Sequence, residues 1–476
     1  MKHYLFYDIE TTGLNKAFDQ VLQFAAIRTD PGLTEIDRHM LTVKIRSDVI
    51  PAPGAVITHR IPPSVTVDGL CEYEATARIH ALMNAPGTVS VGYNSLGFDD
   101  EFLRFAFHRN LFPPYTHQYA GGCGRMDLLP MAAIYRLHKP AVMAWPAVGG
   151  VPTLKLEHLS AANELAAGPA HDALVDVEAT VALAKKFVAE RPTWDYLVGA
   201  FDKRTDRDRA DKIPSLFQSP AGIHRKGLMV GAQYGAERNY QVPVLSIGTS
   251  LPYGNQSLWL RLDQPELCQT TEETIASTTW VVRKRFGEPG ILLPPSERFW
   301  RLVDKERSQV VEDNIRWIKA NDRLFQKIIR HHTEFAYPVI PNLDSDAALY
   351  QNGFLNRKEE AACRVFHGAD PVEKVKLAEK MPSNKTRMMA ERILWRNWPE
   401  NLTPAMVQAF DAYLLRVNPA VATEALLDYR GEARNTPVAA LGEIAAMLGD
   451  RKADLDPEQR ALLGELAAHI RGKFNG

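Results

Sequence analysis

Four carboxylates in the first part of the chain have the type and spacing of a metal site. Asp8 and Glu10 stand two residues apart at the end of the apolar run Tyr4–Ile9, and in a strand their side chains would point to the same side. Like charges at the mouth of a buried strand repel each other, and oxygen-rich sites favour hard cations such as Mg²⁺ or Mn²⁺. The pair alone is equally compatible with two acids at a solvated strand end.

Asp99 and Asp176 are placed by predicted helices. The residues at three, four, seven and eight positions after Asp99 are all apolar, which is one helical face. We therefore expect Asp99 to lie over the stripe that faces the sheet. Asp100 is rotated away and is expected to be solvated or to cap the helix. The helix that carries Asp176 has Asp172 as its predicted N-cap.

His171 is the candidate base. It precedes Asp176 by five residues, and a continuous helix would separate the two by roughly 140° at about 100° per residue. His171 is therefore expected in the loop before the helix. A His-x4-Asp motif alone would indicate only a histidine in a loop. The carboxylates elsewhere in the chain are what favour a catalytic role for His171.

The elements that must position these residues read as mixed α/β. Buried strands are predicted at Tyr4–Ile9, Gln20–Thr29, Leu41–Ile45 and Thr88–Tyr93. The texture changes after Glu190. A mixed charge run at 200–212 reads as a connection, and 226–285 as a small β-barrel or sandwich. Helical patterns cover 298–331 and, from about 347, the rest of the chain, where prolines divide them.

The bulk composition limits the possible classes. The chain has 476 residues, 45% hydrophobic and 24% charged, with a net charge of −1, so we expect two or three globular domains. No signal-peptide pattern or membrane-spanning run is found. The four cysteines are widely spaced, which disfavours a zinc or disulfide framework and favours a cytoplasmic protein.

The order Asp-x-Glu, Asn-x-x-x-Phe-Asp and His-x4-Asp resembles the DEDDh (DnaQ-like) 3′→5′ exonucleases. Further segments are similar to the bacterial exodeoxyribonuclease I family: 23–30, 53–56, 92–94, 98–101, 156–159, 170–173 and 348–354. The similarity is close over the first 200 residues and patchy but collinear beyond. Ile9 and Thr12 depart from the family, in which an aromatic residue is expected.

The resemblance implies an α/β fold class: a ribonuclease H-like exonuclease domain with a mixed sheet (1–190), an SH3-like β-domain with a helical extension (191–346) and a C-terminal helical domain (347–476). It also implies hydrolysis of single-stranded DNA to 5′-mononucleotides, in DNA repair and recombination. Implied partners are single-stranded DNA and the C-terminal tail of single-stranded DNA-binding protein, with no membrane and a monomeric state.

The resemblance also assigns roles. Asp8, Glu10, Asp99 and Asp176 would hold two Mg²⁺ ions, which Mn²⁺ could replace, and His171 would take the proton from the attacking water. Glu10 and Thr11 would hold the terminal 3′-OH, and Lys155 would contact the substrate. The implied DNA contacts are Arg104, Tyr115, Tyr119, Tyr196, Lys203, Arg283 and Lys284. For each tyrosine core packing is the alternative, and for the basic stretch 283–285 an ordinary exposed edge is as good an explanation.

Two other functions remain open from the sequence. An exoribonuclease or proofreading exonuclease would use the same five catalytic residues, although the two extra domains argue against it. A catalytically silent nucleic-acid-binding scaffold is the other possibility, and the filled catalytic positions argue against it.

Overall fold

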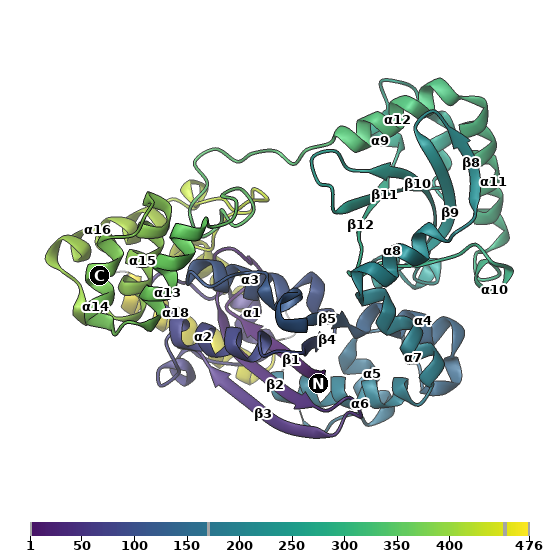
Figure 1. Ribbon diagram of the computed structural model, residues 1–476. Coiled ribbons are helices and arrows are strands. Elements are labelled where there is room, and N and C mark those ends of the chain that lie inside the picture. The colour runs from purple at the N-terminus through teal and green to yellow at the C-terminus, as the bar shows by residue number, and fades with distance from the viewer. Residues whose placement is uncertain (1, 169–171, 451–454, 475–476) are drawn as a thin grey trace.

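A five-stranded mixed sheet forms the centre of the N-terminal part of the chain (Figure 1). The computed structural model describes residues 2–168, 172–450 and 455–474. The strand order is β3-β2-β1-β4-β5, with β1 antiparallel to β2 and parallel to β4. The strands are β1 His3–Thr11, β2 Val21–Thr29, β3 Glu35–Thr42, β4 Thr88–Gly92 and β5 Gly124–Asp127. The third strand lies earlier than the predicted 41–45, because the register with β2 pairs Thr29 with Glu35 and Gln23 with Thr42.

Helices cover both faces of this sheet, and alternation along β1 decides which residues meet them. Leu5, Tyr7 and Ile9 pack in a core with α2 and α3, whereas Phe6 packs in the core that α4 and α6 share. Asp8 and Glu10 have the parity of Phe6, so β1 directs both carboxylates toward the α6 face. The helices are α2 Glu72–Met83, α3 Asp99–Arg109, α4 Leu128–His138, α5 Leu156–Asn163, α6 Ala173–Val188 and α7 Arg191–Val198.

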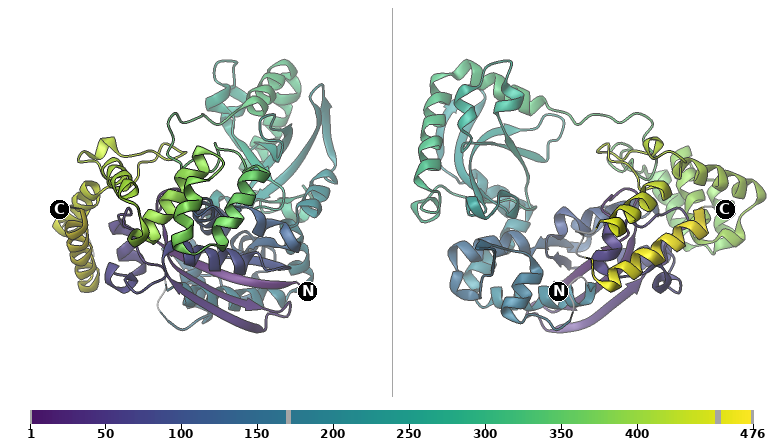
Figure 2. Two further views of the ribbon diagram at one scale, coloured as in Figure 1. Left: turned by 60° about the vertical axis from the view of Figure 1, so that its left-hand side comes forward. Right: turned by 180° about the vertical axis from the view of Figure 1, so that it is seen from behind.

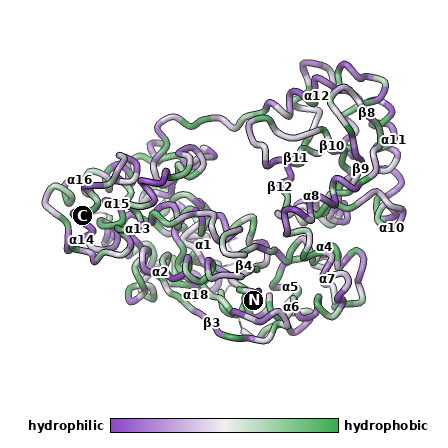
Figure 3. The backbone as a smooth tube through the Cα atoms, in the orientation of Figure 1, coloured by the Kyte–Doolittle hydropathy of each residue, from purple (hydrophilic) through white to green (hydrophobic). Residues whose placement is uncertain are grey.

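An antiparallel sheet with two long helices makes a second lobe, which we call the β-lobe. Its strand order is β12-β11-β10-β9-β13, with β8 paired to β9. The helices α11 and α12 pack on the sheet through a common apolar cluster, and hydrophobic and hydrophilic stretches alternate along them (Figure 3). The elements are β8 Ser215–Ser219, β9 Gly222–Val230, β10 Gln241–Thr249, β11 Gln256–Arg261, α9 Ile275–Thr278, β12 Val281–Arg285, β13 Ile291–Leu293, α10 Glu297–Trp300, α11 Lys305–Ala320 and α12 Asp322–Glu334.

The charge run expected to be a connection is a helix, α8 Lys203–Asp211. Asp202 caps it by accepting a hydrogen bond from the N–H of Thr205 at 2.8 Å. Ala210 is buried in a cluster with residues of the β-lobe. The capping bond and the two buried side chains, Ala210 and Asp206, give a polar sequence a stable helix.

A helical lobe follows an extended segment that runs from the β-lobe across Figure 1. Its helices are α13 Arg357–Gly368, α14 Pro371–Glu379, α15 Asn384–Asn397 and α16 Pro404–Val417. They share a core that also takes in Tyr73 and Leu111 of the nuclease part. The last two helices, α17 Pro437–Gly449 and α18 Pro457–Phe474, lie side by side against the nuclease part (Figure 2). There they form a core with Val56 of α1 Pro53–His59.

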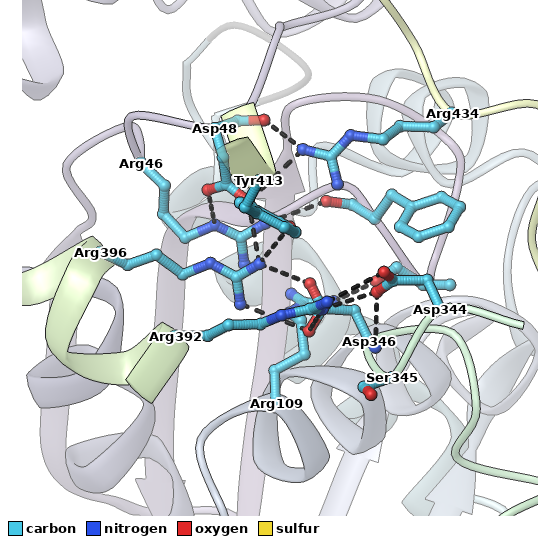
Figure 4. A network of polar contacts seen from close by, with 12 residues as sticks. Arg46, Asp48, Arg109, Asp344, Ser345, Asp346, Arg392, Arg396, Tyr413 and Arg434 are labelled. Atoms are coloured by element: carbon cyan, nitrogen blue, oxygen red, sulfur yellow. Dashed lines mark hydrogen bonds and ion pairs between the residues drawn. The ribbon is translucent and has the colours of Figure 1, made fainter. Parts of the chain in front are cut away.

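A buried network of charges joins the nuclease part to the helical lobe (Figure 4). Asp48 is completely buried and lies 2.9 Å from Arg396 and 3.1 Å from Arg46. Arg396 also reaches Asp346 at 2.5 Å. Burial alone would raise the pKa of Asp48, but Arg396, Arg46 and Arg434 hold it well below its usual range.

The element order agrees with the expected fold class, while the domain boundaries at 190 and 346 stay predictions. The nuclease core continues into Leu228 and Ile291 of the β-lobe, so packing does not stop at residue 190. In the described part of the chain, no helix combines the length and apolar character that crossing a membrane requires.

Candidate active site

Asp8, Glu10 and Asp176 form a compact carboxylate cluster. Asp176 lies in the first turn of α6, which packs against β1. One oxygen from each of the three side chains lies within 4.8 Å of the other two, and all three residues are half-buried. Three anionic oxygens at this spacing are a donor set for a hard divalent cation, so the residues present fit such an ion.

Asp172 places Asp176 by capping α6. Its Oδ1 accepts hydrogen bonds from the N–H groups of Leu174 at 3.0 Å and Val175 at 3.3 Å. The predicted cap is therefore confirmed. Asp176 then follows one turn later on the face that meets β1.

Asp99 enters from the other side of the sheet, at the first residue of α3. The turn before it needs Asn94 in the left-handed region (φ 63°). Asp127, at the end of β5, fixes this turn by accepting from the N–H groups of Asn94 at 2.9 Å and Leu96 at 3.1 Å. The Asp99 carboxylate accepts a hydrogen bond from the backbone N–H of Ile9, between the two acids of β1.

The carboxylates raise one another's pKa. Burial, together with the charges of Asp99, Glu10 and Asp176, raises the pKa of Asp8 well above its usual value. Burial and the charges of Asp176 and Asp99 raise that of Glu10 to about 8, and burial raises that of Asp99 to about 7. A bound cation would relieve this mutual repulsion, which is the electrostatic signature of a metal site.

The candidate base, His171, lies outside the described residues. Thr11 is buried, and its hydroxyl donates to the Gly13 carbonyl at 2.8 Å; its role in holding the 3′-OH stays a prediction. Lys155 is the N-cap residue of α5; its side chain is 73% exposed and its Nζ lies 3.4 Å from Glu157.

The predicted DNA contacts fall into exposed and enclosed groups. Tyr119 and Lys203 are exposed. Tyr196 is 37% exposed and carries the Arg209 guanidinium 3.9 Å from its ring centroid. Arg283 is half-buried and stacks on Phe335 at 4.6 Å. For these residues the role in binding DNA stays a prediction.

Arg104 and Tyr115 are more enclosed. The guanidinium of Arg104 lies 3.1 Å from Asp100 and 5.9 Å from the ring centroid of Tyr115, and Arg104 is only 8% exposed. Lys284 is 2% exposed, and its ammonium lies 2.7 Å from Asp206. The prediction that Lys284 contacts DNA is therefore wrong: alternation along β12 turns this side chain inward, toward a buried counter-ion.

Sequence reasoning also misplaced one acid and missed another. Asp100 was expected to be solvated or to cap the helix, but it is fully buried and paired with Arg104, His117 and Arg125. Asp127 was assigned no role. Its signal was available in the sequence, because Asp127 stands directly before an apolar segment that runs to Leu137, and an acid at the start of such a segment is a typical N-cap.

Known proteins match this chain over most of its length. The exonuclease (RNase_T) family model matches residues 5–184. Exodeoxyribonuclease I of Escherichia coli (strain K12) is 32% identical over 391 residues, covering 77% of this chain and 80% of that protein. Exodeoxyribonuclease I of Buchnera aphidicola subsp. Acyrthosiphon pisum is 37% identical over 394 residues, covering 78% and 91%.

Solved structures match over the whole length. The crystal structure of E. coli Exonuclease I in complex with a dA16 oligonucleotide has a TM-score of 0.83 and 27% identity, and covers 99% of this chain and 100% of that chain. A moderately thermophilic Exonuclease I from Methylocaldum szegediense gives a TM-score of 0.80 at 26% identity, with the same coverage. These matches confirm the expected fold class.

Proposed function

This chain belongs to the exodeoxyribonuclease I family, and we propose that Asp8, Glu10, Asp99 and Asp176 bind the divalent metal with which it shortens single-stranded DNA. It is a metal-dependent 3′→5′ exodeoxyribonuclease, a phosphodiester hydrolase. The observation that supports the site is the cluster of three carboxylates within 4.8 Å. The metal we propose is Mg²⁺, as two ions, with Mn²⁺ as a substitute, because oxygen-only donor sets suit both.

The residues around the scissile phosphate divide the work. Two divalent ions bound here would activate the attacking water and neutralise the leaving oxygen. His171 takes the proton from that water, since a histidine titrates near neutral pH. His171→Ala should therefore lower the rate by about 10²–10⁴-fold while leaving metal affinity unchanged.

The enzyme digests DNA in the 3′→5′ direction because its site holds the 3′ end of the strand. The Glu10 carboxylate and the backbone at Thr11 hold the terminal 3′-OH, and exposed Lys155 approaches the backbone phosphates. Tyr119, Tyr196 and Lys203 are exposed, and we propose that they contact the strand. Stacking on aromatic rings and ion pairs with phosphates would hold DNA without reading its sequence.

A digestion assay tests this proposal. Strands of DNA labelled at the 5′ end are incubated with Mg²⁺ or EDTA, alongside RNA of the same sequence and DNA with a 3′-phosphate. We expect the labelled DNA to shorten from its 3′ end when Mg²⁺ is present. RNA, and DNA in EDTA, should stay intact. A 3′-phosphate should block the digestion of DNA. Asp8→Ala and Asp176→Ala should abolish turnover. The control Asp195→Ala breaks a surface pair with Arg191 and should leave it unchanged.

The outcomes separate the competing functions. Near-normal turnover in Asp8→Ala would overturn the site. Faster cleavage of RNA would favour an exoribonuclease, and binding without cleavage would favour a silent scaffold.

The proposal extends to partners and setting. We propose a monomer that acts in the cytoplasm, in DNA repair and recombination. The free thiols of all four cysteines agree with a reducing compartment such as the cytoplasm. The acidic C-terminal tail of single-stranded DNA-binding protein would dock on cations near the nuclease part. Lys203, Arg204 and Arg207 of α8 are exposed there. A fluorescent acidic peptide is titrated with the wild-type protein and with a variant in which all three residues are changed to Glu. Equal affinities of the two proteins for the peptide would exclude α8 as the docking site.

A further inference from the structure

The two acids that follow Asp99 each lead to a different lobe. The first, Asp100, binds Nη1 of Arg125 at 2.7 Å and Nε2 of His117 at 2.8 Å. The other amino group of Arg125 lies 3.0 Å from Glu288, in the turn between β12 and β13. One arginine therefore connects the first turn of α3 to the β-lobe.

The second acid, Glu101, is held by residues that flank the helices α13–α16 on both sides, and we call the part of the chain from Tyr350 onward the C-terminal region. Its Oε1 accepts hydrogen bonds from the hydroxyls of Tyr350 at 2.7 Å and Tyr429 at 2.8 Å. Its Oε2 lies 3.2 Å from Nη2 of Arg430. One turn further along α3, Phe105 stacks on the Tyr429 ring at 5.3 Å and meets the Tyr350 ring edge-on at 5.5 Å.

Glu101 also reaches the loop that follows β1. Lys16 lies 2.7 Å from Oε2 of Glu101 and donates to the Gly97 carbonyl at 2.9 Å. Lys16 therefore ties the loop after Asp8 and Glu10 to the turn before Asp99. The carboxylate of Glu101 thus joins three parts: the β1 loop, the start of α3 and the C-terminal region.

A displacement of either acid must move Asp99. The three residues are consecutive in one turn of helix, which rises about 5.4 Å, so the backbone transmits any shift directly. Misplacement of a catalytic group by about 1 Å can cost about 10²-fold in rate. Neither Asp100 nor Glu101 points at the carboxylate cluster, so each would act on the reaction through Asp99.

We propose that Asp100 and Glu101 are positioning residues that make the placement of Asp99 depend on the docking of the β-lobe and of the C-terminal region. The inference rests on the proposed function in that Asp99 must be a metal ligand. The enzyme would then bind its metal in full only when both lobes are seated.

Full-length variants with Mn²⁺ as the probe test this coupling. Glu101→Gln should weaken Mn²⁺ binding in calorimetry about tenfold and lower kcat on 5′-labelled DNA at least tenfold, with KM for DNA unchanged. The double variant Tyr350→Phe/Tyr429→Phe removes both hydroxyl donors and keeps both rings, and it should shift Mn²⁺ affinity in the same direction. Glu288→Gln should do so more weakly, because it acts through Arg125.

Non-additivity is the sharper readout. The triple variant, Glu101→Gln with both tyrosine changes, should lose less Mn²⁺ affinity than the sum of the two separate losses, since all three side chains meet at one carboxylate. Arg430→Lys keeps the charge and should retain most of the affinity.

Arg60→Ala is the matched control. It breaks the contacts of Arg60 with Asp456, at 2.5 Å, and with Glu458, between α1 and the C-terminal helices. It should leave Mn²⁺ affinity unchanged. The proposal is overturned if Glu101→Gln lowers only the melting temperature, or if Arg60→Ala gives the same loss of Mn²⁺. If Asp99→Ala binds Mn²⁺ normally, the premise that Asp99 is a ligand fails instead.

Discussion

At the scale of single residues, the carboxylates of the active site repel one another. Glu10 sits among Asp176, Asp99 and Asp172, and burial with their charges raises its pKa to about 8. Protons and divalent cations therefore compete for the same oxygens. Metal affinity should rise with pH through the neutral range, because each ligand must lose its proton before it binds.

The metal-free protein should lose stability as the pH rises. A glutamate in the unfolded chain ionises near 4.5, whereas Glu10 in the folded chain ionises near 8. Between these values the folded state holds a proton that the unfolded state has released, so the free energy of unfolding falls with increasing pH. Urea unfolding in EDTA across this range measures the slope.

Substitution isolates the contribution of Glu10. Glu10→Gln cannot ionise, so its slope should be flatter than that of the wild type. Glu178→Gln, on the outer side of α6 beside Arg38, is the control and should keep the wild-type slope. Equal slopes for all three proteins would show that Glu10 does not carry this pH dependence.

At the scale of elements, helix starts place the chemistry. Asp99 begins α3 and Asp176 lies in the first turn of α6. Asp172 caps α6, and Asp127 holds the turn before α3 by accepting from the N–H groups of Asn94 and Leu96, so small local interactions set the positions of these two proposed ligands.

Removing the cap of α6 should therefore affect both stability and turnover. Asp172→Ala deletes the acceptor for the N–H groups of Leu174 and Val175, which should cost about 0.5–2 kcal/mol of stability. Asp304→Ala removes the equivalent cap of α11, where Asp304 accepts from Arg307 at 2.8 Å. Both variants should unfold earlier in urea, but only Asp172→Ala should lose exonuclease rate. Equal rates in the two variants would mean that the cap does not position Asp176.

The elements near the site were largely predictable from the sequence. The run 4–9 and the apolar spacing after Asp99 identified β1 and α3 because hydrophobic periodicity reports which face is buried. The position of Asp172, directly before a predicted helix, likewise identified it as the N-cap of α6. These are local properties, and local patterns carry them.

The contacts that were missed are long-range. Asp100 was expected to be solvated or to cap the helix because it lies off the apolar stripe, but His117 and Arg125 come from other elements to pair with it. Lys284 likewise faces inward, where it pairs with Asp206 of α8, a helix much earlier in the chain. Pairing partners of this kind are set by tertiary packing, so periodicity along one element cannot reveal them.

At the scale of the whole molecule, buried charges hold the lobes together. Arg396 lies between Asp48 of the nuclease part and Asp346 of the connecting segment, and all three are buried. Burial costs such ions their hydration, and their mutual attraction offsets this only while every partner is present.

Removing one member should therefore destabilise the protein strongly. Arg396→Leu leaves Asp48 and Asp346 without their shared cation, and the expected loss is about 3–5 kcal/mol in urea unfolding. Adding Asp346→Asn should recover part of it, because one uncompensated charge is then gone. Arg60→Ala, in an exposed pair, should change little. A loss below about 1 kcal/mol for Arg396→Leu would place it with surface pairs and contradict this account.

The packing of α1 against α17 and α18 has a consequence for how the protein is made. Val56 is translated long before its core partners Ile444 and Leu463. Synthesis delivers the chain from its N-terminus, so this core cannot close until the last helix emerges. We expect ribosome-stalled chains ending before α17 to be cut by protease within α1, and full-length chains to be protected there; equal protection would contradict this. A DNA-degrading enzyme would thus close this part of its core only after α18 has been translated.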